Sequence, residues 1–150
     1  MNWLFNRRQF EVNLQQAIDA VDRHERTNVA LVMLDMDDFK LVNDPHGHEV
    51  EDIVLRIVAA RLAEGARAND TVARVGGDEF MLICPDLQNH ENADAFCQRM
   101  LDSLKRPIPV EVSQIYIGAS IGTAFYPDAA DSADELIRRV DIAMYDAKKQ

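Results

Sequence analysis

Apolar residues recur along this chain at the spacing of an amphipathic helix in four segments. They lie three or four residues apart, so they share one face of each helix. The four predicted helices cover residues 10–21, 50–62, 93–104 and 132–148. Gly65 is placed to end the second helix, and Ser132 with Glu135 predicts a capping box at the start of the fourth.

Shorter apolar runs between these segments predict β-strands. Residues 29–34 form a continuous apolar run of the kind typical of a buried central strand, which we expect to end at Asp35. Residues 71–75 and 80–84 are expected to pair as a hairpin, with Gly76 and Gly77 at positive φ in its turn. Residues 110–112 and 115–125 are expected to form a second hairpin.

The order of the predicted elements is helix, strand, helix, hairpin, helix, hairpin, helix. Hairpins interleaved with helices favour an α/β protein of the α+β type. We expect a central mixed, largely antiparallel sheet of about five strands, flanked by helices. A length of 150 residues predicts one domain, covering residues 1–150.

The net negative charge of the chain excludes some classes of binding partner. Sixteen Lys and Arg against 26 Asp and Glu leave a formal net charge of −10, which argues against binding to nucleic acid or an anionic membrane. A nucleotide is still compatible, because a metal ion reverses the local sign. The six glycines complete neither a P-loop nor a dinucleotide-binding fingerprint.

The remaining composition predicts a cytoplasmic setting for this segment. No apolar run approaches the roughly 20 residues of a membrane helix, and no signal peptide is visible. Cys84 and Cys97 lie in apolar patterns and are expected to be reduced thiols of the core. Whether a parent protein is anchored in a membrane stays open.

Acidic residues stand at the ends of two predicted buried strands. Asp35 follows the first apolar run, with Asp37 and Asp38 next, and Asp35 and Asp37 point to one face of an extended chain. Asp78 and Glu79 separate the two glycines from the next apolar run. Each acid alone is typical of a turn. Together they favour a metal site, because clustered carboxylates repel one another unless protonated or bound to a cation. Oxygen ligands predict Mg²⁺ or Mn²⁺ rather than Zn²⁺.

Residues 74–80 read Arg-Val-Gly-Gly-Asp-Glu-Phe and contain a complete GGDEF signature. On this motif, and on five further segments, the chain resembles the GGDEF domain of diguanylate cyclases, which join two GTP molecules into cyclic di-GMP. The resemblance implies a nucleotide-cyclase or polymerase-palm-like fold with the glycine hairpin at the active site. The further segments are residues 6–10, 34–40, 43–48, 119–122 and 141–148.

The resemblance implies a metal site and a catalytic set. The metal ligands would be Asp35, the Met36 backbone carbonyl, Asp78 and Glu79, holding two Mg²⁺ or Mn²⁺ ions per active site. Such ions polarise the α-phosphate and lower the pKa of the attacking 3′-hydroxyl. Glu79, Asp78 and Lys40 would be the catalytic residues, with Glu79 assisting proton loss.

The resemblance also implies substrate contacts. Gly76 and Gly77 would let the triphosphate approach the backbone, and Asn43 and Asp52 would read guanine. Lys40 and Lys148 would contact phosphate oxygens. Each lysine also has a simpler explanation: Lys40 would be only a solvated surface charge, and Lys148 would interact with the dipole of the helix near whose end it stands. His48 is expected to pack at a helix entry rather than bind metal. The implied substrate-binding residues are Phe39, Asn43, Asp52, Gly76, Gly77 and Lys148.

A second site is implied by the spacing of Arg67 and Asp70 ahead of Gly76, which matches the family's product-inhibition site. Arg suits bidentate contact with guanine or phosphate, and Asp accepts from guanine N–H groups. The alternative is a surface salt bridge near a helix end, worth about 0–1 kcal/mol.

Three features depart from the family pattern. Glu51 stands where the family usually has Gly, and Pro45 and His46 occupy a loop usually filled by other residues. An Arg that often follows the Lys148 motif is absent. We expect the chain to be a fragment of a larger multidomain protein with attached sensory or effector domains.

The resulting hypothesis is a metal-dependent diguanylate cyclase that uses GTP and works as an at least transient homodimer, since two half-sites must face each other. An alternative, favoured by Glu51 and Pro45, is a weak or inactive module that binds GTP or cyclic di-GMP and regulates an attached domain. A third is a dimerisation scaffold that binds neither nucleotide.

Overall fold

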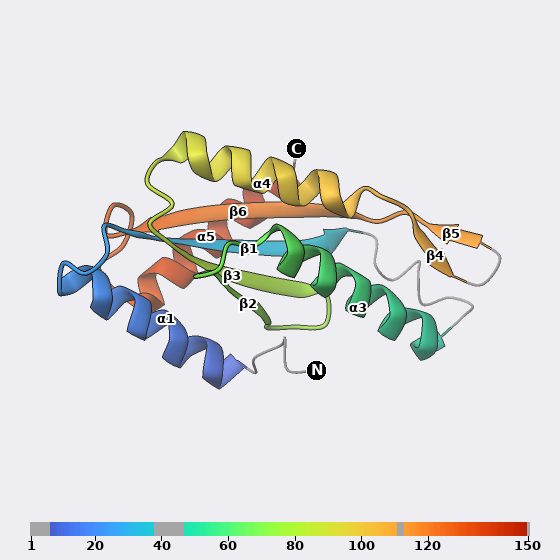
Figure 1. Ribbon diagram of the computed structural model, residues 1–150, viewed down its shortest axis with the longest axis horizontal. Helices are drawn as coiled ribbons and strands as arrows, with labels where there is room; N and C mark the ends of the chain where they lie inside the picture. The colour runs from blue at the N-terminus through green and yellow to red at the C-terminus, as the bar shows by residue number, and fades with distance from the viewer. Residues whose placement is uncertain (1–6, 38–46, 111–112, 150) are drawn as a thin grey trace.

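In this computed structural model, which describes residues 7–37, 47–110 and 113–149, helices cover both faces of a four-stranded antiparallel sheet (Figure 1). The strand order is β2-β3-β1-β6, and every neighbouring pair in this sheet is antiparallel. The four strands are β1 (Val29–Asp37), β2 (Thr71–Arg74), β3 (Glu79–Pro85) and β6 (Gly118–Tyr126). The expected α+β class is confirmed.

The described helices lie where the apolar spacing predicts them. They are α1 (Arg7–Asp22), α3 (Gly47–Gly65), α4 (His90–Leu104) and α5 (Ala133–Lys148). None of the helices in these residues is both long and apolar enough to cross a membrane.

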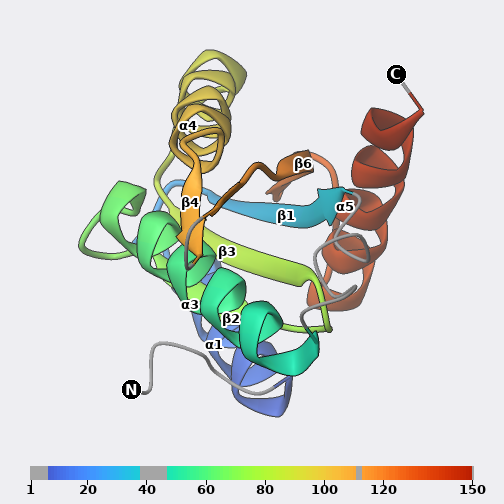
Figure 2. The same cartoon turned by 90° about the vertical axis from the view of Figure 1, so that its right-hand side faces the viewer.

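The alternation of side chains along β1 divides the core in two. Ala30, Val32 and Leu34 face α3 and α4, whereas Leu31 and Met33 face α1 and α5. Figure 2 shows these two pairs of helices on opposite sides of the sheet. Because β1 is covered on both faces, its sequence is continuously apolar rather than alternating.

β1 extends beyond the predicted end of the strand at Asp35 and runs to Asp37. Its ladder with β6 continues to the pair Asp37 with Gly118, and its ladder with β3 ends at Asp35 with Glu79. Polar side chains therefore did not end the strand, because its backbone is still paired on both sides at Asp35.

The second predicted hairpin is wrong in its pairing. β4 (Ile108–Val110) pairs with β5 (Ser113–Ile115) as a separate two-stranded ribbon. The long strand β6 leaves this ribbon and pairs with β1 over nine positions. Pairing with the central strand buries Ala124, Phe125 and Tyr126, which a partner as short as β4 could not cover.

The predicted roles of three glycines also change. Neither Gly76 nor Gly77 has a positive φ, so the turn between β2 and β3 is not the expected tight turn; the strands are joined by residues 75–78. Gly65 is the last residue of α3 rather than a stop beyond it. A Cβ there would lie 3.0 Å from the sulfur of Met100, so α3 packs closely on α4 at this glycine.

The start of α5 forms half of the predicted capping box. The Ser132 hydroxyl accepts a hydrogen bond from the Glu135 backbone N–H at 3.2 Å. The Glu135 carboxylate accepts from the backbone N–H of Asp131, not from that of Ser132. The helix start is still satisfied, with the second bond moved by one residue.

Candidate functional site

The face of β1 that packs on α1 and α5 changes from apolar to acidic at the C-terminal end of the strand. Met33 is buried, and Asp35 and Asp37 follow at alternate positions on the same face. In the antiparallel register Asp35 lies directly opposite Glu79 of β3. Two like charges directly opposite each other destabilise a sheet. The strand pairing therefore creates an electrostatic strain that the sequence pattern alone did not show.

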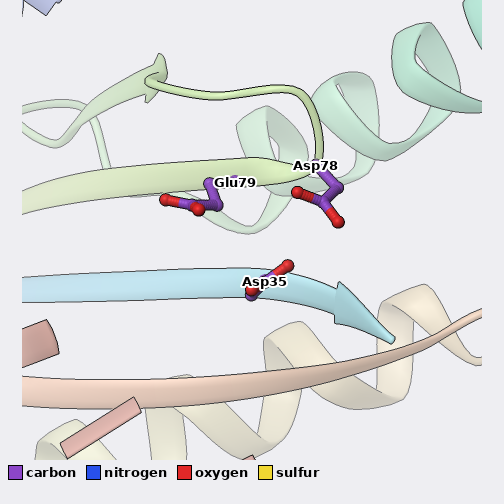
Figure 3. Close-up of side chains that lie close together, drawn as sticks. All are labelled: Asp35, Asp78 and Glu79. Carbon is purple, nitrogen blue, oxygen red and sulfur yellow. The ribbon is translucent and has the colours of Figure 1, made fainter. Parts of the chain in front are cut away.

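Asp78 joins this pair from the loop that enters β3. One carboxylate oxygen from each of Asp35, Asp78 and Glu79 lies within 4.8 Å of the others. Figure 3 shows Asp35 on β1 facing the start of β3, where Asp78 and Glu79 lie. The Met36 backbone N–H donates to the Asp78 carbonyl at 3.0 Å, which ties the loop to β1. We call these three residues the carboxylate group.

Asp35 is the most enclosed member of the carboxylate group. It is only 7% exposed, and its Oδ2 accepts a hydrogen bond from the Lys148 ammonium at 2.7 Å. Its other oxygen, Oδ1, is buried and has no hydrogen-bond partner among the residues that the structure describes. A buried carboxylate oxygen without a partner is costly and rare. This oxygen, next to two further acids, fits a divalent cation that binds oxygen ligands.

The environment disfavours the charged forms of two of these acids. Burial raises the pKa of Asp35 above its ordinary value, although the hydrogen bond from Lys148 opposes the shift. Burial also raises the pKa of Glu79, and the charges of Asp35 and Asp78 raise it further. The hydrogen bond to Asp35 raises the pKa of Lys148, so its ammonium stays charged. Added positive charge would thus stabilise the carboxylate group.

The loop before Asp78 is held by an arginine that sequence reasoning did not single out. The Arg74 guanidinium donates from Nε to the Gly76 carbonyl and from Nη2 to the Gly77 carbonyl, each at 3.0 Å. A Cβ at Gly77 would meet no atom of the described residues within 4 Å. No pattern of side chains marks this role of Arg74, because it depends on the directions of two backbone carbonyl groups.

Asp37 shares the face of Asp35 but has a different partner. Its carboxylate accepts a hydrogen bond from the Ser120 hydroxyl of β6 at 3.0 Å. It is not among the three acids that converge within 4.8 Å. The expectation that Asp35 and Asp37 lie on one face therefore holds, but only Asp35 joins the carboxylate group.

Other predicted site residues lie apart from this group or outside the description. Asp52 is exposed on α3, which packs on the opposite face of the sheet from α5. The Met36 side chain is buried on that opposite face too, and only its backbone lies beside Asp78. Phe39, Lys40, Asn43, Pro45 and His46 lie outside the described residues, as does the side chain of His48.

Arg67 and Asp70 form a local pair after α3. The Arg67 backbone N–H donates to Asp70 Oδ2 at 2.7 Å, and its Nη2 donates to Asp70 Oδ1 at 2.9 Å. Nη2 also donates to the Pro85 carbonyl at the end of β3 at 2.6 Å. The Asp70 side chain is 0% exposed. The pair is thus more buried and better bonded than the surface salt bridge considered above.

Two cavities lie away from the carboxylate group. One of about 300 Å³ borders Arg67, Asp86, Phe96 and Arg99. A larger one, of about 610 Å³, lies at the opposite end of the sheet beside Asp22, His24 and Pro127. Two acids at its walls are bonded within the chain: Asp22 accepts from the Tyr126 hydroxyl at 2.6 Å, and Asp86 accepts from the Arg26 guanidinium at 2.9 Å. The chemistry suggested by the sequence therefore belongs to the carboxylate group, not to the larger cavity.

Comparison with known proteins identifies what the chain is similar to. The family profile described as "Diguanylate cyclase, GGDEF domain" matches residues 1–150. The bifunctional diguanylate cyclase/cyclic di-GMP phosphodiesterase MucR of Pseudomonas aeruginosa is 39% identical over 97% of this chain and 21% of its own length. The cyclic di-GMP phosphodiesterase NbdA of the same organism is 35% identical over 80% of this chain and 15% of its length. The chain thus spans about a fifth of these relatives or less.

Solved structures share the fold. The GGDEF domain of TpbB (YfiN) from Pseudomonas aeruginosa has a TM-score of 0.92 and 36% identity, with 98% of this chain and 86% of that chain covered. The GGDEF domain of DgcB from Caulobacter crescentus, solved in complex with cyclic di-GMP, has a TM-score of 0.88 and 27% identity. The match covers 97% of this chain and 86% of the DgcB chain.

Proposed function

Because this chain belongs to the GGDEF family of diguanylate cyclase domains, we propose that it condenses two molecules of GTP into cyclic di-GMP. In each of two transfers, the 3′-oxygen of one GTP bonds to the α-phosphorus of the other. The bond from that phosphorus to the β-phosphate oxygen breaks, and one pyrophosphate leaves. The 3′-hydroxyl proton passes to a base or to water.

The observation that supports this proposal is the convergence of Asp35, Asp78 and Glu79 around a buried Asp35 oxygen that has no partner within the described part of the chain. We assign these side chains, with the Met36 backbone carbonyl, to hold two Mg²⁺ or Mn²⁺ ions. When bound, such ions supply Lewis-acid polarisation of the α-phosphate and lower the pKa of the 3′-hydroxyl. All three side chains of this group offer oxygen ligands, and Mg²⁺ and Mn²⁺ prefer oxygen ligands.

We assign Glu79 to take the 3′-hydroxyl proton. The family resemblance supports this role, because a carboxylate within reach of the 3′-hydroxyl can act as a general base. Its place at the first position of β3, across from Asp35, fixes its backbone. Asp78 and Lys40 complete the catalytic set that the family resemblance implies.

We assign triphosphate binding to the glycine loop and to lysines. A Cβ at residue 77 would have open space around it, so packing within the described residues does not explain why this residue is glycine. Close approach of a ligand would explain it. Lys148, at the end of α5 beside the carboxylate group, is the described lysine placed to contact phosphate. Phe39 and Lys40 are kept in this set from the resemblance.

Guanine recognition and assembly complete the proposal. We assign Asn43 and Asp52 to the base, as the resemblance implies. One GTP bound per chain requires two chains facing each other across a two-fold axis, so we propose a homodimer. We also propose that residues 1–150 are one GGDEF domain of a larger protein, because relatives such as MucR are about five times longer than the matched part.

The proposal is tested by incubating the chain with GTP and Mg²⁺ and separating the nucleotides by chromatography. To supply the dimer, the chain is also fused to a constitutive coiled coil. We expect cyclic di-GMP to accumulate, and faster per chain in the fused protein. Asp78→Ala should abolish the product. Asp94→Ala, which removes an exposed acid on α4, is the matched control and should keep activity.

A second function, regulation by nucleotide binding, is favoured by the names of relatives and by one residue. NbdA is named as a phosphodiesterase, so its matching segment belongs to a protein that breaks cyclic di-GMP down. Glu51 adds a half-buried carboxylate beside Asp52, where the family usually has Gly. Tight GTP binding without turnover in the forced dimer would favour this function over catalysis. A calorimetric titration without heat for either nucleotide would favour a scaffold.

We further propose that Arg67 and Asp70 mark a product-inhibition site. The 300 Å³ cavity beside Arg67 also borders Arg99, which places two guanidinium groups at its walls. A GGDEF domain of DgcB has been solved with cyclic di-GMP, so a related domain binds this molecule. To bind product, Arg67 would have to exchange part of its bonding to Asp70 and Pro85 for the ligand.

A further inference from the structure

Lys148 is the cation that pairs with the carboxylate group within the described residues. Its Nζ lies 2.7 Å from Asp35 Oδ2. Arg7 lowers the pKa of Glu79 only through a longer-range charge interaction. Among residues 7–37, 47–110 and 113–149, the three converging carboxylates thus have one close counter-charge, and it belongs to the residue assigned above to the triphosphate.

We propose that Lys148 is a place-holder for the divalent cation: it pairs with Asp35 in the cation-free domain, and the arriving cation releases it to bind the triphosphate. This inference rests on the proposed metal site. It adds to that function a coupling, carried by one side chain, between cation binding and phosphate binding.

Electrostatics requires the exchange. A cation bound to Asp35 would lie beside the ammonium, and two positive charges at such separation repel by about 1 kcal/mol or more per unit of charge. Departure of Lys148 without a replacement would leave Asp35 buried and unpaired, which is strongly unfavourable. The Lys148 ammonium and the divalent cation must therefore exchange at Asp35. If both stayed they would repel each other, and if both left the buried carboxylate would be unpaired.

The position of Lys148 allows this movement. It is the last residue of α5, its side chain is 36% exposed, and its four-carbon stem is flexible. The end of a helix favours a positive charge, so the freed ammonium remains stabilised there. The side chain can then reach outward to a phosphate without any change in the backbone.

A purely positioning role for Lys148 predicts the opposite result. If Lys148 served to aim Asp35 at the cation, its removal would misplace a ligand and weaken cation binding. If it is a place-holder, its removal abolishes a competitor and strengthens cation binding. The sign of the change in affinity therefore separates the two roles.

The experiment is a titration of the chain with Mn²⁺, without nucleotide, in which electron paramagnetic resonance measures the free ion. Lys148→Gln should bind Mn²⁺ about tenfold more tightly than the natural chain, because a neighbouring positive charge is gone. Lys149→Gln is the matched control. It makes the same charge change one residue away, where the ammonium lies 4.6 Å from the Tyr145 ring, and should alter the affinity by less than about twofold.

Two further measurements complete the test. Thermal unfolding with and without Mn²⁺ shows that each variant folds, and the Mn²⁺-induced rise in Tm should be larger for Lys148→Gln and for Lys148→Met. A non-hydrolysable GTP analogue should tighten Mn²⁺ binding less in these variants than in the natural chain.

Equal or weaker Mn²⁺ binding in both neutral variants would overturn the proposal, as would the absence of Mn²⁺ binding in all variants. If the variants bind Mn²⁺ more tightly but the natural chain makes no cyclic di-GMP, the exchange stands and the catalytic proposal fails. The two failures are therefore distinguishable.

Discussion

Gly122 on β6 lies directly against Met144 on α5. A Cβ at residue 122 would be 2.3 Å from the Met144 backbone nitrogen and 2.7 Å from its Cα. No side-chain rotation relieves such a contact, because the atoms belong to the helix backbone. This contact sets how closely α5 packs on the sheet, and with it where Lys148 stands relative to Asp35.

Gly122→Ala should therefore destabilise the fold and disturb the site together. Overpacking of this kind costs about 1–3 kcal/mol, and here the helix must move because backbone atoms are in the way. Urea unfolding should show the loss in the free energy of unfolding. Residual folded protein should bind Mn²⁺ more tightly, because the displaced α5 carries Lys148 away from Asp35. An alanine at 122 that leaves both quantities unchanged would contradict the packing described here.

Gly77→Ala should separate folding from ligand approach. A Cβ at this position meets no described atom within 4 Å, and Gly77 does not have a positive φ, so stability should change by less than about 0.5 kcal/mol. Binding of GTP with Mg²⁺, measured by calorimetry, should weaken if the triphosphate lies against this backbone. Unchanged GTP affinity in this variant would remove Gly77 from the proposed triphosphate site.

The contribution of Glu79 to the stability of the cation-free chain should fall as pH rises through the acidic range. The folded-state pKa of Glu79 is raised above its ordinary value, mainly by burial, so the folded chain holds this proton more tightly than the unfolded chain. Its contribution is fully present below the ordinary pKa and is lost as pH rises through the raised pKa. Glu79→Gln should flatten this decline relative to the natural chain.

Unfolding with urea from about pH 4 to pH 7, in chelator, measures the dependence of stability on pH. Added Mg²⁺ should also flatten the decline in the natural chain, because a cation stabilises the charged carboxylates. The exposed substitution Asp94→Asn is the control and should leave the slope unchanged. A slope that is identical in the natural chain and Glu79→Gln would show that Glu79 titrates normally.

Arg67→Ala should reduce both stability and product inhibition. It removes the guanidinium partner of a fully buried Asp70 carboxylate, which we expect to cost about 1–3 kcal/mol. The concentration of cyclic di-GMP that halves the rate should rise about tenfold if this pair also recognises product. Comparison with Asp70→Asn and the double variant gives the coupling energy by a double-mutant cycle. Additive losses would indicate that the two side chains act independently.

Local patterns predicted most of the elements of this fold. The helical spacing of apolar residues placed all four described helices, and the run at 29–34 identified the central strand. These elements were predictable because each buries at least one face, and the spacing of apolar residues along the element shows which face is buried. The second hairpin was not, since a strand's partner depends on which distant strand offers the longer ladder.

The candidate site was only partly predictable for the same reason. Asp35, Asp78 and Glu79 were identified from acids at strand ends and from the signature. The register that places Asp35 opposite Glu79, and the packing that brings Lys148 to Asp35, join residues distant in the chain. Arg74 was missed because its role depends on two carbonyl groups, whose directions no side-chain pattern reveals.

The two thiols of this domain lie within its apolar layers. Burial raises the pKa of Cys84 well above its ordinary value and raises the pKa of Cys97 to about 12. Neither sulfur is a thiolate at neutral pH, and the thiolate is the form that alkylating reagents attack. A cysteine introduced on the surface would accept a spin label or a fluorophore while Cys84 and Cys97 stay unmodified. Such a label would report directly whether two chains approach each other when GTP is added.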